Sequence, residues 1–284
     1  MSVSLVAAHP TLLPIAEEVC KALGLEAPHL PSAVNEASLF LEAAGDTPLK
    51  GNGLEVLAVL RRGDARDGLV VSDDHAAVRG ADVLADPHAF DPTDPLRALG
   101  EGAVVAAHGA LRCSQIAINR PDLDVRIVEE GDREVLRHWE DGTVDAAVIP
   151  SALLDLSGFT ATVRRRLAPP WITTAAAGGL WLRGEWSAEL RELVLPLDDR
   201  ASRLELIAER AVSDAIETGE GVSLGVEATV SQGRLDLRAT LIQGSERRSI
   251  AASRQGEATM RGAQRLAAVL VRDLRERGAG ATRP

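Results

Sequence analysis

The chain of 284 residues contains no tyrosine, three phenylalanines and four tryptophans, so aromatic residues make up only 2% of it. Its cores must therefore be built from Leu, Val, Ala and Ile, within an apolar fraction of 45% that is typical of globular proteins. Cysteine is scarce as well, because Cys20 and Cys113 stand alone, without the CxxC spacing of a metal or redox motif. Two isolated cysteines favour a reducing cytoplasm over a disulfide framework.

Other absences narrow the class of protein. No apolar run approaches the roughly 20 residues that span a bilayer, and residues 1–10 (MSVSLVAAHP) lack the basic start and long apolar segment of a secretory signal. The net charge is −11, and no basic segment is interleaved with aromatics, which argues against nucleic-acid binding. Residues 73–75 (DDH) are adjacent in sequence and rarely converge on one ion. We therefore expect a cytoplasmic protein without membrane, nucleic-acid or metal partners.

The first two thirds of the chain alternate between strand and helix patterns. A short apolar strand over residues 3–8 is followed by a helix over 11–23, which Gly24 ends. Later strands are predicted over residues 54–60, 69–72, 103–107, 123–128 and 144–149, with helices over 109–119 and 131–140. Over residues 103–149, alternation at this spacing is typical of parallel strands that are joined by crossover helices.

From about residue 198 the periodicity changes. Apolar residues from Leu204 to Ile216 recur at helical spacing, and three alternating runs follow at 222–230, 235–241 and 247–252. Residues 232–233 (QG) mark a hairpin turn, and a last helix covers 263–274. The pattern predicts a small α+β unit with a three-stranded antiparallel sheet.

Residues 102–159 carry motifs that resemble a known family. RPDL at 120–123 and the pair of Gly142 with DA at 145–146 are the strongest anchors; RGDARD at 62–67, AERA at 208–211 and LGVEA at 224–228 follow the same order. Over about residues 55–284 the chain is similar to hydroxymethylbilane synthase (porphobilinogen deaminase), an enzyme family of tetrapyrrole (porphyrin and heme) biosynthesis.

This resemblance implies an α/β fold with three domains. Two would be α/β domains like those of periplasmic binding proteins, the first of them truncated, and the third would be the small α+β unit. The implied boundaries are 1–68 with 168–198, then 69–167, then 199–284. The family also implies a cleft between the first two domains and a dipyrromethane cofactor on a cysteine of the third.

Several residues that the family chemistry requires are replaced. Glu220 stands at the position of the cofactor cysteine, and a carboxylate cannot form the thioether, so no dipyrromethane is expected. HGALR at 108–112 keeps one of two family arginines, Arg112, as a candidate binding residue, whereas EEG at 129–131 replaces another arginine by a carboxylate. Asp46 takes the place of the catalytic aspartate.

Three functions remain open from these residues. The first is a degenerate, non-catalytic family member that binds a small anionic ligand in the cleft or associates with a partner enzyme of tetrapyrrole synthesis. The second is a divergent deaminase that polymerises porphobilinogen to hydroxymethylbilane from a non-standard primer anchor, such as the thiol of Cys113. The third is a module that binds an unrelated anion. His108 and Cys113 are interpreted first as structural residues at the start of a helix.

Overall fold

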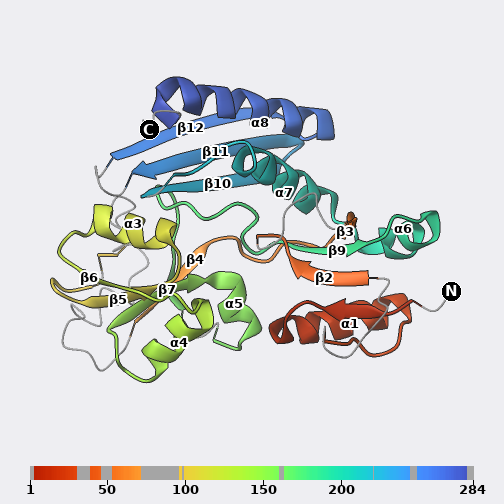
Figure 1. Cartoon of the computed structure of the whole chain (residues 1–284), viewed down its shortest axis with the longest axis horizontal. Coiled ribbons are helices and arrows are strands. Elements are labelled where there is room, and N and C mark those ends of the chain that lie inside the picture. The colour runs from red at the N-terminus through yellow and green to blue at the C-terminus, as the bar shows by residue number, and fades with distance from the viewer. Residues whose placement is uncertain are drawn as a thin grey trace.

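The structure of the protein, a computed structural model, describes residues 3–30, 39–45, 53–71, 96–97, 99–159, 163–219, 221–243 and 248–279. Within these ranges the strands form three sheets. Figure 1 shows a C-terminal sheet with a long helix along the top of the molecule and two α/β lobes side by side beneath it. We refer to the four-stranded sheet and its helices as lobe 1, to the five-stranded sheet and its helices as lobe 2, and to residues 200–279 as the C-terminal layer.

Lobe 1 is built from two distant parts of the chain. Its strands are β1 (Leu5–Ala7), β2 (Leu39–Ala43), β3 (Glu55–Val59) and β9 (Leu180–Gly184), in the order β1-β2-β9-β3. β1 is parallel to β2, and β9 runs antiparallel to β2 and β3. A 3-10 turn (Pro10–Leu12) leads into α1 (Leu13–Leu23), which ends at Gly24 with a φ of 67°. The apolar face of α1 packs with α6 (Ala188–Val194) and the sheet in one core.

Lobe 2 is a mixed sheet in the order β6-β5-β7-β4-β8. Its strands are β4 (Asp67–Val71), β5 (Val104–Ala107), β6 (Asp124–Ile127), β7 (Ala146–Pro150) and β8 (Val163–Arg166). β5 is parallel to β6 and β7, whereas β4 is antiparallel to β7 and β8. α3 (Ala110–Asn119) packs in one core of this lobe. α4 (Asp132–Glu140) and α5 (Ser151–Leu156) pack in a second core on the other face of the sheet.

The C-terminal layer places two helices on one face of an antiparallel sheet. β10 (Val222–Ser231), β11 (Arg234–Gln243) and β12 (Arg248–Glu257) pair in sequence, and α7 (Arg200–Ser213) and α8 (Met260–Leu274) cover them. Asp199 and Thr259 begin these helices by accepting hydrogen bonds from the N–H groups of Ser202 and Gly262. The β10–β11 turn has positive φ angles at Gln232 and Gly233, 49° and 76°, as a two-residue hairpin requires.

The chain passes between the two lobes twice. The first crossing segment is residues 60–66, between β3 and β4, and the second is residues 168–179, between β8 and β9. The double crossing arises because lobe 1 contains residues from both sides of lobe 2 in sequence. It also makes these two segments the covalent connections across which the lobes are oriented.

Most sequence predictions of elements are confirmed, with shifts of a few residues at their ends. The mixed α/β fold and the three-stranded antiparallel sheet are confirmed. The predicted parallel pairing over residues 103–149 is confirmed, because β5 is parallel to β6 and β7, whereas the earlier strand β4 runs antiparallel to its neighbours. The sequence patterns did not predict five further elements: β2, α5, β8, β9 and α6. No helix of the described ranges is long and apolar enough to cross a membrane.

Candidate functional site: the cleft between the lobes

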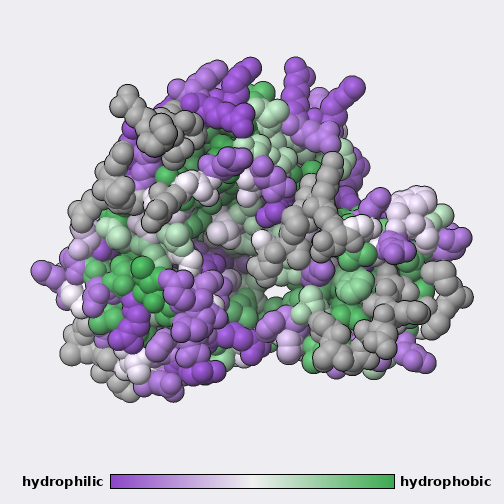
Figure 2. All heavy atoms as spheres, in the orientation of Figure 1, coloured by the Kyte–Doolittle hydropathy of each residue, from purple (hydrophilic) through white to green (hydrophobic). Residues whose placement is uncertain are grey.

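A cleft of about 1140 Å³ lies between lobe 1 and lobe 2. Its walls come from α1 on one side, from α5 and the start of α3 on the other, and from both crossing segments. The space-filling view shows the molecule hollowed between the two lobes beneath the C-terminal layer (Figure 2). Ligand cavities of proteins commonly measure roughly 300–1,000 Å³, so the cleft can hold a small molecule together with water.

On lobe 2, the cleft meets the start of α3. Gly109 stands at the helix N-cap with a φ of 88° and provides no side-chain cap. The first N–H groups of a helix have no acceptor within the helix, and they carry a partial positive charge. The adjacent His108 uses Nδ1 to contact the carbonyl oxygen of Val128 at 2.7 Å, which fixes the ring beside the helix start. This wall therefore offers hydrogen-bond donors to a ligand.

Arg112 also reaches the cleft wall, but its guanidinium is largely committed within the protein. Its Nε donates to Asp67 Oδ1 at 2.9 Å and its Nη1 donates to Asp132 Oδ1 at 3.0 Å. Trp171 Nε1 donates to the second oxygen of Asp67 at 2.9 Å. Although burial alone would lower it, the two carboxylates raise the pKa of Arg112 above its usual range. Arg112 thus ties together β4, α3, α4 and the second crossing segment.

On lobe 1, the wall is mainly apolar. Leu12, Ile15 and Val19 of the helix region line it, and Leu60 lies beside them at the start of the first crossing segment. None of the residues of α1 hydrogen-bonds or ion-pairs with lobe 2 within the described ranges. Among the described residues, the crossing segments therefore connect the two lobes, and α1 adds no polar contact across the cleft.

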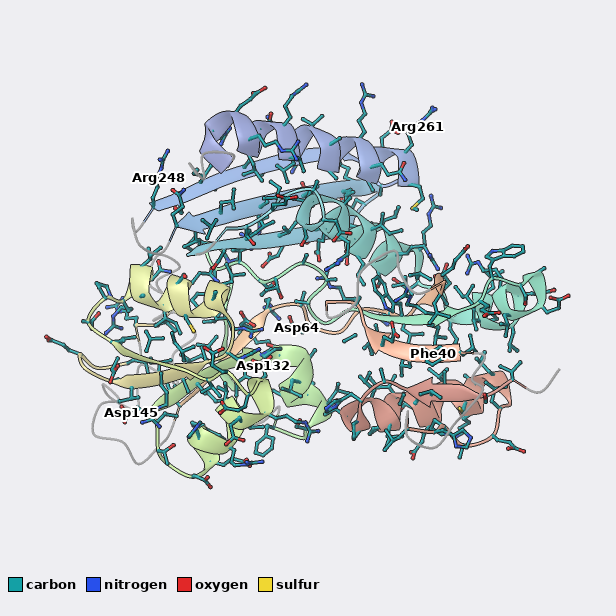
Figure 3. All side chains as sticks on the ribbon, in the orientation of Figure 1. Phe40, Asp64, Asp132, Asp145, Arg248 and Arg261 are labelled. Atoms are coloured by element: carbon teal, nitrogen blue, oxygen red, sulfur yellow. The ribbon has the colours of Figure 1, made fainter. Side chains whose placement is uncertain are left out.

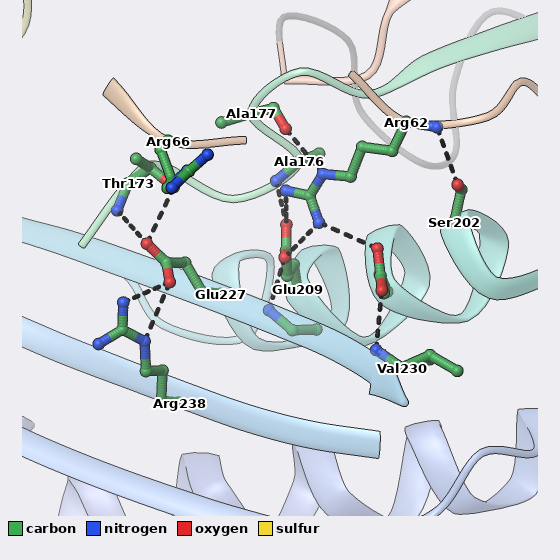
Figure 4. Close-up of polar contacts among 12 residues, drawn as sticks. Arg62, Arg66, Thr173, Ala176, Ala177, Ser202, Glu209, Glu227, Val230 and Arg238 are labelled. Atoms are coloured by element: carbon green, nitrogen blue, oxygen red, sulfur yellow. Dashed lines mark hydrogen bonds and ion pairs between the residues drawn. The ribbon is translucent and has the colours of Figure 1, made fainter. Parts of the chain in front are cut away.

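The crossing segments are held by carboxylates of the C-terminal layer, and Figure 4 shows this network. Both oxygens of Glu209 on α7 accept from the guanidinium of Arg62 in the first segment, at 2.8 and 3.0 Å. The same carboxylate accepts from the N–H of Ala176 in the second segment and from the N–H of Ala228 on β10, each at 2.6 Å. Arg62 Nε donates to the carbonyl oxygen of Ala177 at 2.8 Å. One buried ion pair therefore joins both segments to the layer.

Glu227 on β10 provides a second attachment. Its Oε1 accepts from the N–H of Thr173 at 3.1 Å, and its other oxygen pairs with Arg238. Arg238 also donates to the carbonyl oxygen of Trp171 at 2.9 Å, and the N–H of Val226 donates to the carbonyl oxygen of Thr173. One backbone hydrogen bond and the side chains of Glu227 and Arg238 thus hold the second crossing segment against β10.

The electrostatics of these carboxylates follow from their burial. Burial raises the pKa of the Glu209 carboxyl, against the opposing charge of Arg62 and the backbone donors. Arg62 responds in the matching way, because the Glu209 carboxylate outweighs burial and raises the pKa of the guanidinium. Burial alone would also raise the pKa of Asp64, but hydrogen bonds from Arg66 hold it below its ordinary value.

Figure 3 shows Asp64 on the first crossing segment and Asp132 at the start of α4.

The structure places the predicted site residues unevenly. Arg112 lines the cleft, whereas Asp46, Glu220 and the DDH run at 73–75 lie outside the described residues. The roles predicted for Asp46 and Glu220 and the expected absence of dipyrromethane therefore stay predictions. No group of three or more metal-binding side chains occurs in the part of the chain that the structure describes.

The cysteines and tryptophans are mainly structural. Cys20 and Cys113 are buried, and burial raises the pKa of both thiols. Trp171 and Trp181 are buried, and Trp139 packs edge-on against Phe159. Trp186, by contrast, is 62% exposed.

Sequence reasoning missed the residues that hold the crossing segments. Glu209 appeared only inside the AERA motif, and Asp67 and Glu227 were not singled out. An acidic residue beside an apolar helical stripe is the one local signal at Glu209. Its partner Arg62 lies 147 positions away in sequence, so the pairing has no local signature.

Comparisons with known proteins do not place the chain in a family. No family model matches it. Among solved structures, a substrate-binding domain of an amino acid ABC transporter from Streptococcus pneumoniae matches with 11% identity, covering 67% of this chain and 89% of that one, at a TM-score of 0.40. A TRAP periplasmic solute-binding protein from Bradyrhizobium in complex with galacturonate matches with 13% identity over 74% and 83%, at 0.36. An extracytoplasmic solute receptor of Bordetella pertussis that binds pyroglutamic acid matches with 15% identity over 76% and 81%, at 0.36.

These findings contradict the predicted membership of the hydroxymethylbilane synthase family. The predicted roles in tetrapyrrole synthesis, as a degenerate or a divergent deaminase, are contradicted with it. The predicted cytoplasmic location is contradicted as well, because the matched structures are periplasmic or extracytoplasmic proteins.

The physical reason is visible at the motif residues, which serve the fold. Arg120 caps the carbonyl oxygens of Leu96 and Leu99, Gly142 adopts a φ of 65° in a turn, and Asp145 accepts from the N–H of Val104. These residues therefore stabilise the fold, and a fold does not by itself imply a function.

Proposed function

We propose that the protein binds a small solute in the cleft between lobe 1 and lobe 2. The observation that carries the proposal is the cleft itself, about 1140 Å³, lined by two lobes that are connected by two crossing segments. Two-lobed α/β architectures place ligands between the lobes because both walls can contribute contacts there.

Within this proposal, the donors at the start of α3 favour a solute that carries a carboxylate. The N–H groups at Ala110 and Leu111 point along the helix axis toward the positive end of the macrodipole, and both residues line the cleft. His108 lies beside them, and Arg61 adds a cation from the first crossing segment. The anionic character of the ligand rests on this combination within one cavity.

The division of the chain into three domains also belongs here. We propose the boundaries 1–68 with 168–198, then 69–167, then 199–284, because each range holds most of one sheet and of its core cluster. Limited proteolysis that releases a stable fragment near residue 199 supports this division. Cleavage that leaves no stable fragment contradicts it.

The binding proposal is tested by a substitution at the start of α3, in the lobe 2 wall of the cleft. Ala110 is exposed at the first position of α3, where glutamate suits the helix dipole but repels an anionic ligand. We expect Ala110→Glu to fold normally and to lose the thermal stabilisation that carboxylates such as malate and hexanoate give to the unaltered protein. Ala188→Glu is the matched control, since Ala188 is exposed at the first position of α6 and does not line the cleft.

The outcome separates the alternatives. Loss of the thermal shift in the Ala110 variant alone supports an anion site at the start of α3. An equal shift in both variants contradicts binding there. The absence of any shift with the unaltered protein, across small acids and their neutral amides, contradicts the proposed function.

A further inference from the structure

Two apolar rows face each other across the cleft. Leu12, Ile15 and Val19 line it from lobe 1 on one helical face, where Leu12 and Val19 are 6% and 4% exposed and pack mainly in the lobe 1 core, so that the half-buried Ile15 offers the main contact. Leu153 and Leu156 line it from α5 of lobe 2, again three residues apart. Each lobe therefore contributes an apolar strip to the same cavity.

The α5 strip includes surface that the fold leaves uncovered. Leu156 is 37% exposed and is one of the large hydrophobic side chains that remain exposed in the described part of the chain. Exposed apolar side chains that gather in a cavity mark a site of contact with a ligand or partner. The cavity is bounded on both sides, so a small molecule fits it better than a protein surface does.

Charged side chains of the cleft lining are mostly engaged within the protein. Asp132 is held by Arg112, Asp155 pairs with Arg166 at 2.9 Å, and Asp198 pairs with Arg203. A ligand rich in hydroxyl or charged groups would compete with these internal pairs or leave its own groups without partners, which is costly. The surface without such internal pairs is the apolar strips, the donors at the start of α3, and the exposed Glu18 and Arg61.

From this arrangement we infer that the solute is an amphipathic monocarboxylic acid, with its head at the start of α3 and an aliphatic chain between α1 and α5. The inference rests on the proposed function and names the class of its ligand. Burial of each methylene contributes about 0.8 kcal/mol, so affinity should rise about fourfold with each carbon that the strips cover.

The test is isothermal titration of the whole protein with butanoate, hexanoate and octanoate, with malate as the polar acid and hexanamide as the neutral head. We expect the dissociation constant to fall about fourfold per methylene up to the length of the cavity. Malate and hexanamide should each bind at least tenfold more weakly than hexanoate.

A matched pair of variants locates the chain-binding strip. Leu156→Ser should reduce the gain per methylene, whereas Ile127→Ser should not, because Ile127 is 60% exposed on β6 and does not line the cleft. Malate binding as tightly as octanoate, with no dependence on chain length, overturns the inference and leaves the proposed function standing. Binding of none of the acids overturns both.

Discussion

The crossing segments and the cleft walls are held in opposite ways. In the crossing segments, a buried ion pair and backbone hydrogen bonds join residues 60–66 and 168–179 to the C-terminal layer. Along the cleft, α1 makes no hydrogen bond or ion pair with lobe 2 among the described residues. The difference teaches that the lobes are oriented from behind, by the layer, so that the facing walls stay available to a solute.

Removing the buried ion pair should have the largest effect. Glu209→Gln removes the carboxylate that pairs with both ends of the Arg62 guanidinium and leaves only Glu205, 3.6 Å away, as its counter-charge, so the loss should lie near the lower end of the roughly 3–5 kcal/mol that breaking a buried pair costs. The measurement is the free energy of unfolding from urea titration. The double variant Arg62→Leu with Glu209→Leu removes both charges and should recover part of the loss. A Glu209→Gln variant as stable as the unaltered protein would contradict the anchoring role.

Close packing of the second crossing segment predicts an intermediate effect. A Cβ added at Gly179 would overlap the Leu206 side chain on α7, so Gly179→Ala should lower the free energy of unfolding by about 1–3 kcal/mol. Gly63 in the first crossing segment is the control, because a Cβ there would meet Ala152 and Gly178 at 3.5 Å, an ordinary contact distance. Thermal denaturation of the two variants gives the comparison. Equal losses would show that the packing against α7 is not tight.

The smallest effect concerns the contact between lobe 1 and α7 at low pH. Burial alone would raise the pKa of Asp198, but hydrogen bonds from Arg203 and from the N–H of Val59 hold it below its ordinary value. A depressed pKa contributes stability that is present above the unfolded value of about 3.9 and is lost as the pH falls through the folded value. Asp198→Asn should therefore flatten the loss of stability between neutral pH and pH 3 in urea titrations. An unchanged slope would remove Asp198 from the account.

How far the sequence predicts the structure depends on whether the signal is local. The strand at 104–107 follows from an apolar run, and the strand at 124–127 follows from alternating apolar residues. Gly109 and Gly131 mark the turns from these strands into the helices that follow them. β9 was missed because it pairs with β2 and β3, strands more than 120 positions earlier in the chain. α6 has only seven residues, too few for a periodic pattern.

The same limit applies to the candidate site. The helix start at Gly109 was placed correctly, and Arg112 was assigned to the cleft, where it lies. Its partners Asp67 and Asp132 come from two other elements, so the commitment of its guanidinium could not be read from the motif. The motif residues at 120–123 and 142–146 were interpreted through a family resemblance. In the structure, Arg120 and Asp145 instead hydrogen-bond to backbone groups and stabilise the fold.

The most direct test of solute binding between the lobes is an amide-resolved NMR titration of the whole protein with hexanoate. We predict concentration-dependent shifts at Ala110, Leu111 and Leu156, with Thr173 of the second crossing segment and Val226 of β10 little changed because neither lines the cleft. Shifts confined to other surfaces, or no shifts at saturating hexanoate, would contradict binding in the cleft.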